Sequence, residues 1–129
     1  MDGTHSPMSL HLKYRLGIAE MNRDIDILRI FDDYLTELRS QKNNTEISAG
    51  IDHFEKEFVR LRKEIDDLRH QMHLHKMNLA ALSREGKMLD DETYKSEDHD
   101  GLAKRYFELR KRFDKVREEF ATFESKWLK

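Results

Sequence analysis

The chain has 129 residues, of which 39% are charged, with one proline, no cysteine and a formal net charge of −2 at pH 7. This length suits one domain rather than two, and the lack of cysteine excludes disulfides and cysteine-ligated zinc. The small net charge excludes a bulk field that attracts nucleic acid or acidic membranes, and no apolar run approaches the roughly 20 residues that span a bilayer.

The first predicted helix covers residues 7–42. Pro7 suits its first turn, where a missing N–H costs no hydrogen bond, and the Asn43–Thr45 segment predicts the turn that ends it. Apolar residues recur at intervals of three and four, as on one face of a helix. They are Tyr14, Ile18, Met21, Ile25, Leu28, Phe31, Leu35 and Leu38.

The second half of this helix is apolar around most of its circumference. Ile27, Ile30 and Tyr34 lie off the face that carries Leu28 and Leu35. A helix that is apolar on two sides is usually buried on two sides. We therefore predict that Ile27, Ile30 and Tyr34 form an interaction surface, for which a homodimer through this helix is one form. Contact with two neighbouring helices of the same chain is the alternative.

The second predicted helix covers residues 46–85 and the third covers residues 97–128. Asn44 or Thr45 is expected to cap the second helix, and the sequence leaves open whether the polar segment 87–95 is ordered. Both helices carry a seven-residue apolar repeat, which is typical of coiled-coil packing. The repeat comprises Ile47, Ile51, Phe54, Phe58, Leu61, Ile65, Leu68, Met72, His75, Leu79 and Leu82, then His99, Leu102, Tyr106, Leu109, Phe113, Val116, Phe120, Phe123 and Trp127.

The apolar faces of consecutive helices match when the helices are paired in opposite directions. Short connections also make consecutive helices antiparallel neighbours. The predicted pairs include Leu38–Ile51, Phe31–Phe58, Tyr14–His75, Phe54–Trp127 and Leu61–Phe120. The sequence therefore predicts an all-α fold, an elongated antiparallel three-helix bundle with coiled-coil-like packing and up-down-up topology, as a single domain over residues 1–129.

Histidines are the residues best suited to chemistry in this chain. His75 falls on the apolar face of the second helix, opposite Tyr14 and Tyr106 in the predicted alignment. A Tyr–His–Tyr layer can satisfy its own polar atoms and fix the alignment of a bundle. We predict that Tyr14, His75 and Tyr106 form a polar core layer. A ligand-binding or proton-sensing role for His75 is the alternative.

Asp67, His70, His73 and His99 are the candidate metal ligands. Asp67 and His70 are three residues apart, as in carboxylate-bridged metal sites, but such sites take this pair from two helices. We expect His70 and His73 to face solvent, and the acidic residues around His99 to favour the start of the third helix. No bound cofactor is expected, and metal binding through these four residues is an alternative hypothesis.

The third helix is rich in basic residues between positions 104 and 117, but acidic residues are interspersed as on an ordinary solvated helix. A face that contacts nucleic acid is therefore a second alternative. The sequence has no glycine-rich phosphate loop, no Gly-x-Ser-x-Gly and no cysteine nucleophile. The first residues also lack a signal-peptide pattern. We predict a non-enzymatic interaction, scaffold or small regulatory protein of the cytoplasm.

The last eighty or so residues contain four segments that carry a family resemblance, namely Asp52–Phe58, Ile65–His70, Glu97–His99 and Phe113–Leu128. They resemble a family of small uncharacterised helical proteins of Bacteroidetes-type bacteria. The resemblance implies a helical fold and a cytosolic bacterial setting, and it assigns no functional residue. The overall plan is also similar to that of spectrin-type repeats, although Trp127 lies at the end of the third helix and not in the first.

Overall fold

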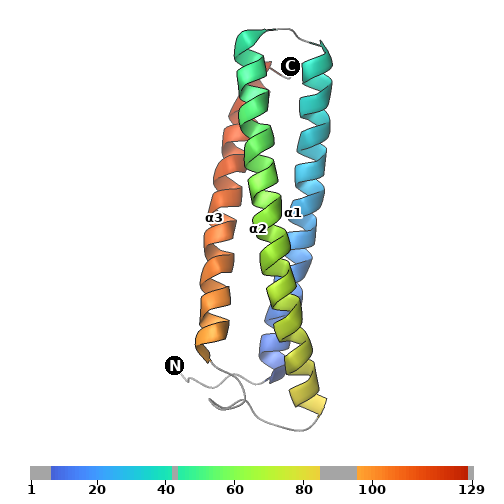
Figure 1. The fold of residues 1–129 in the computed structure, drawn as a ribbon, viewed down its shortest axis with the longest axis vertical. Helices are drawn as coiled ribbons and strands as arrows, with labels where there is room; N and C mark the ends of the chain where they lie inside the picture. The colour runs from blue at the N-terminus through green and yellow to red at the C-terminus, as the bar shows by residue number, and fades with distance from the viewer. Residues whose placement is uncertain (1–6, 42–43, 85–95, 128–129) are drawn as a thin grey trace.

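The computed structural model describes residues 7–41, 44–84 and 96–127. This part of the chain forms three α-helices, α1 (Pro7–Gln41), α2 (Thr45–Arg84) and α3 (Ser96–Trp127). They lie side by side along one long axis, and α2 runs against α1 and α3 (Figure 1). The predicted all-α, up-down-up bundle is confirmed, and each predicted helix boundary lies within one residue of the observed one. Segment 87–95 lies outside the described residues.

The start of α2 is capped by an asparagine. Asn44 Oδ1 accepts hydrogen bonds from the backbone N–H of Glu46 at 2.8 Å and of Ile47 at 3.3 Å. Two amides that have no partner within the helix are thereby satisfied. Of the two expected caps, the structure selects Asn44. Lys126 of α3 reaches Glu46 at 2.8 Å and so ties the end of α3 to the start of α2.

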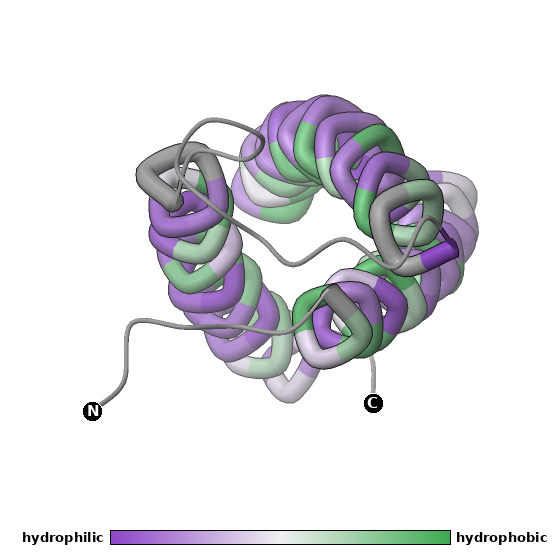
Figure 2. The backbone as a smooth tube through the Cα atoms, turned by 90° about the horizontal axis from the view of Figure 1, so that it is seen from below, coloured by the Kyte–Doolittle hydropathy of each residue, from purple (hydrophilic) through white to green (hydrophobic). Residues whose placement is uncertain are grey.

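A continuous apolar core runs along the bundle, and its members come from the predicted apolar faces. Met21 of α1 and Ile65 and Leu79 of α2 are fully buried. Each large apolar side chain contributes about 1.5–3 kcal/mol on burial, before the entropy cost of ordering it. Seen along the bundle, the three helices surround this shared centre (Figure 2). None of the described helices combines the length and the apolar character that crossing a membrane requires.

The pairing of α1 with α2 follows the prediction. Tyr14 lies beside His75, with ring centroids 5.9 Å apart, and Phe31 lies beside Phe58 at 5.7 Å. α1 packs closely along α2 over its length. Sequence periodicity and a short connection were therefore sufficient to align these two helices.

The alignment of α3 differs from the prediction by one heptad. Phe120, predicted to face Leu61, packs beside Phe54 with ring centroids 5.3 Å apart. Phe54, predicted to face Trp127, also contacts Phe123 at 5.2 Å, whereas Trp127 stays partly buried at the edge of the core. A shift of about seven residues keeps every apolar residue on the apolar face, because the repeat itself is seven. Periodicity cannot distinguish the two alignments, and clustering of the aromatic rings favours the observed one.

α1 and α3 contact each other mainly through long side chains. Their backbones approach at few points, whereas each packs closely along α2. Three pairs bridge the two helices at different heights: Tyr14 with His99, Asp24 with Arg110, and Phe31 with Phe120. This wider separation leaves space between α1 and α3 wherever the facing side chains are short.

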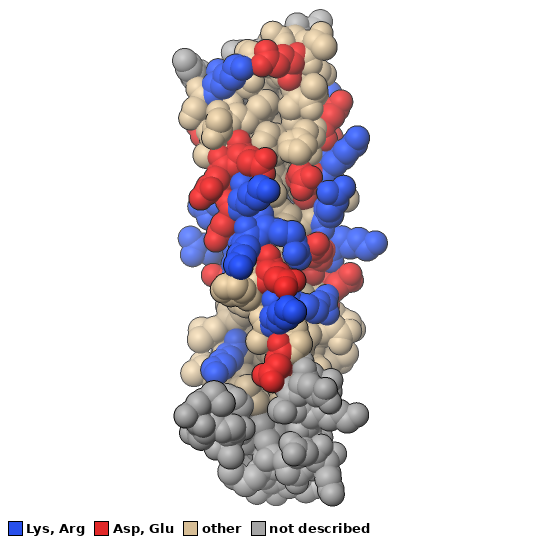
Figure 3. All heavy atoms as spheres, turned by 90° about the vertical axis from the view of Figure 1, so that its left-hand side faces the viewer, with Lys and Arg blue, Asp and Glu red and all other residues tan. Residues whose placement is uncertain are grey.

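The surface on the α3 side is charged across its middle, and basic and acidic side chains are intermingled there (Figure 3). Arg112 of α3 pairs with Glu64 of α2 at 2.7 Å. Arg110 of α3 pairs with Asp24 and Glu20 of α1. Two of the basic residues that suggested a nucleic-acid face, Arg110 and Arg112, therefore make ion pairs between helices. The intermingled acidic side chains leave no uniform positive field on this face.

Candidate functional site

The outer side of α1 carries the predicted contact residues. Ile30 and Tyr34 are 52% and 53% exposed and lie one helical turn apart. Ile27 is only partly exposed and packs against the core, so it belongs to the bundle as much as to this surface. Leu12 and Leu16 are also exposed, about five turns earlier on the same side of α1. We call Leu12, Leu16, Ile30 and Tyr34 the outer α1 surface.

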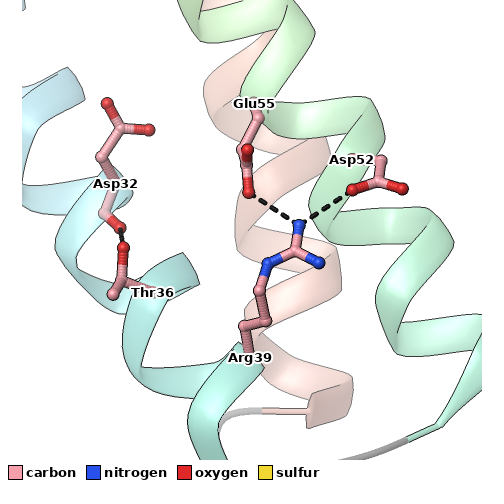
Figure 4. A network of polar contacts seen from close by, with 5 residues as sticks. All are labelled: Asp32, Thr36, Arg39, Asp52 and Glu55. Atoms are coloured by element: carbon pink, nitrogen blue, oxygen red, sulfur yellow. Dashed lines mark hydrogen bonds and ion pairs between the residues drawn. The ribbon is translucent and has the colours of Figure 1, made fainter.

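Charged residues flank the outer α1 surface along the helix. Arg29 lies 3.6 Å from Asp26 between the two apolar pairs. Beyond Tyr34, Arg39 donates hydrogen bonds at 2.8 Å to Asp52 and Glu55 of α2 (Figure 4). Hydrogen bonds to these two carboxylates raise the pKa of Arg39 above its ordinary value. Of these polar contacts, only those of Arg39 join α1 to α2, whereas Asp26 and Arg29 form an exposed pair within α1.

Asp32 lies on the side of α1 near Glu55 and Arg62 of α2, and its charge is disfavoured in the fold. Partial burial is the main reason that its pKa is raised above the ordinary value of 3.8, and repulsion from Glu55 and Asp33 adds to the effect while Arg62 opposes it. The backbone carbonyl of Asp32 accepts a hydrogen bond of 3.0 Å from Thr36 Oγ1 (Figure 4). Ionisation of the Asp32 carboxyl group is therefore disfavoured in the folded chain.

In the described part of the chain, the polar core layer brings together Tyr14, His75 and His99, and the predicted place of Tyr106 in this layer was wrong. The buried Tyr14 hydroxyl and His99 Nδ1 share a hydrogen bond. The His75 ring lies edge-on to both, with centroids 5.9 Å from Tyr14 and 5.4 Å from His99. His99 precedes Tyr106 by one heptad, so the shift of α3 exchanges one for the other.

The structure does not bring the four candidate metal ligands together. Asp67, His70 and His73 are exposed on α2, whereas His99 is buried beside Tyr14. In the described part of the chain, no three histidine, cysteine or acidic side chains are grouped to hold a metal ion. The geometry contradicts a site shared by these four residues, because His99 faces the core and the others face outward.

A buried ion pair between α1 and α3 was missed by the sequence analysis. Asp24 is only 2% exposed, and its carboxylate accepts two hydrogen bonds from Arg110, one of them from Nη2 at 3.1 Å. Burial opposes the charge of Arg110, but Asp24 outweighs it, with help from Glu20 and Asp114, and the pKa of Arg110 is raised. The available signal was the spacing of Asp24, three residues after Met21 and four before Leu28, which places it on the apolar face of the helix.

Comparisons of the chain with known protein families, with curated proteins and with solved structures found no match. The resemblance to small helical proteins of Bacteroidetes-type bacteria therefore stays a prediction.

Proposed function

We propose that this chain is a non-enzymatic helical interaction protein, a scaffold or small regulatory partner, that acts through the outer α1 surface. The observation that carries the proposal is the exposure of Leu12, Leu16, Ile30 and Tyr34 on one side of α1. Other residues fill the core, so the fold does not require these side chains to be apolar. Two exposed apolar pairs on one side of an otherwise charged helix favour contact with another surface.

The proposed contact is one helix against another. Leu12 with Leu16, and Ile30 with Tyr34, form two pairs at a spacing of four residues, which lets side chains of a partner helix pack between successive turns. Asp26 and Arg29 lie between the two pairs and would select the orientation of the partner through their charges. The simplest partner is a second copy that presents the same surface across a two-fold axis. The proposed location is the cytoplasm, which the absence of cysteine supports.

The variant Ile30→Asp tests this proposal, with Val59→Asp as its control. Ile30 is already half exposed, so a carboxylate there should preserve the fold while disrupting an apolar contact. Val59 lies on α2 and is 71% exposed, so Val59→Asp makes a closely similar change on a different helix. Circular dichroism and thermal melting establish that both variants fold like the unmodified chain.

Sedimentation velocity at micromolar concentrations and affinity capture from the native cell then measure association. We expect the unmodified chain and Val59→Asp to form the same dimer or capture the same partner, and Ile30→Asp to lose it. If all three proteins sediment alike and capture the same proteins, the outer α1 surface is not the interaction site.

A further inference from the structure

A groove of about 470 Å³ lies between α1 and α3, beside the Tyr14–His99 pair. All three helices contribute to its mostly apolar lining, which includes Leu10, Gly17, Met72, Ala103 and Tyr106. Sites for small molecules typically have this range of volume, with apolar walls and few polar groups. The groove therefore has the size and lining of a ligand site.

Ala103 leaves the groove open on the α3 side, and Gly17 lets Met72 and Tyr106 pack against the backbone of α1. Gly17 on α1 has no side chain, and Ala103 on α3 has only a methyl group. A Cβ atom added at Gly17 would lie 3.4 Å from Met72 Sδ and 3.7 Å from Tyr106 Cε1. The thioether and the aromatic ring therefore lie opposite Gly17 at ordinary contact distance, as parts of the packed bundle.

The groove has a cation at one end and a carboxylate that approaches Arg110 at the other. Lys13 lines it and makes no ion pair with any residue that the structure describes. Glu20, about two turns further along α1, has Oε1 within 3.7 Å of Arg110 Nε. Tyr14 and His99, which also line the groove, hydrogen bond to each other. A negative group is therefore favoured beside Lys13.

We propose that this groove binds a medium-chain aliphatic carboxylate, with its head group beside Lys13 and its chain along Met72 and Tyr106. A single lysine suits a head group with one negative charge, because phosphate sites generally use several converging donors. The apolar lining favours an aliphatic chain through burial of its surface. This ligand-binding activity is distinct from the proposed protein contact, although Leu16 borders both the groove and the outer α1 surface. The Ile30→Asp variant leaves the groove intact, because Ile30 does not line it.

Isothermal titration with decanoate and with decanol, which has the same chain length without the charge, tests the proposal on the full chain. Ala103→Phe places a ring in the groove from an exposed position on α3, and Ala121→Phe is its control at another exposed position on α3. Lys13→Gln removes the cation, and Lys104→Gln is its control outside the groove lining. Thermal melting establishes that each variant is folded.

We expect Ala103→Phe to weaken decanoate and decanol binding by about tenfold or more, because the added ring takes the space of the chain. Lys13→Gln should weaken decanoate binding about two- to fivefold, the range of an exposed ion pair, and leave decanol binding unchanged. The two control variants should bind like the unmodified chain.

Three results would overturn the proposal. They are the absence of decanoate binding, equal affinity of Ala103→Phe and Ala121→Phe for decanoate, and a Lys13→Gln variant that binds decanoate as tightly as Lys104→Gln does.

Discussion

Asp24 and Arg110 show how two residues distant in the sequence can specify one alignment of a bundle. The Asp24 carboxylate is buried, and Arg110 approaches it from α3 with two hydrogen bonds. The free energy needed to remove these charges from water offsets most of the attraction between them. The pair therefore adds little net stability compared with apolar side chains of similar size. Separating the two charges is costly, however. The pair therefore disfavours other alignments of α3 more than it stabilises the observed one.

We expect Arg110→Met to lower the free energy of unfolding by about 3–5 kcal/mol, because Asp24 would keep a buried charge without its cation. The double variant Asp24→Leu/Arg110→Met should recover most of this loss, since both charges are then absent. Urea denaturation at pH 7 measures both values. A double variant no more stable than Arg110→Met would show that the buried charge is not the cause.

Asp32 should make stability depend on pH. Its raised pKa means that the folded state disfavours the ionised carboxylate more than the unfolded state does. The resulting stability is fully present below the ordinary pKa of 3.8 and is lost as pH rises through the folded value. Asp32→Asn should therefore raise the free energy of unfolding at pH 7, by no more than about 0.5 kcal/mol, because the carboxylate is only partly buried and stays largely in contact with water.

Urea denaturation of Asp32→Asn and of the unmodified chain between pH 3 and pH 7 measures this effect. The gain should shrink as the solution is acidified and vanish below about pH 3.8. A gain that stays constant across this range would mean that it does not arise from ionisation of Asp32.

At the scale of the helix, a glycine lowers stability through its poor helix propensity, but it can raise stability where two helices approach closely. Gly50 of α2 lies against Phe123 of α3, and a Cβ atom there would overlap the aromatic ring. At Gly101 of α3, an added Cβ would meet no described atom within 4 Å beyond the adjoining residues and backbone of its own helix. Both residues lie inside helices, where glycine costs stability relative to alanine. Gly50 thus allows a close approach between helices, whereas packing does not require glycine at position 101.

We expect Gly101→Ala to raise the free energy of unfolding by about 0.5–1 kcal/mol, the gain from helix propensity alone. Gly50→Ala should gain less or become destabilising, because the Phe123 ring must move away from the added methyl group. Urea denaturation of the two variants under the same conditions provides the comparison. Equal gains would mean that α3 does not approach Gly50 as closely as the structure shows.

At the scale of the whole molecule, the interface between α1 and α3 holds most of the features that the sequence analysis missed. Asp24 with Arg110 and Tyr14 with His99 join these helices, and the groove lies between them. Neither helix follows the other directly in the chain, so no short connection limits their alignment. The contacts at this interface therefore depend on the alignment of α3 along α2.

The sequence by itself determined the three helices, their boundaries, their apolar faces and the pairing of α1 with α2. These follow from the periodicity of neighbouring residues and from a short turn, which are local properties of the chain. The exposure of Ile30 and Tyr34 was also predicted, because they lie off the apolar face. The prediction for Ile27 was correct only in part, because Ile27 packs against the core. A helix with two neighbouring helices buries a wider face than a helix with one neighbour.

Only the tertiary structure decided the alignment of α3, and with it the replacement of Tyr106 by His99 in the polar layer. A seven-residue repeat is unchanged by a shift of one heptad, so the pattern of apolar residues favours several alignments equally. The aromatic cluster around Phe54 and Phe120 and the ion pair of Asp24 with Arg110 distinguish these alignments. Their energies depend on residues that meet only after all three helices have packed.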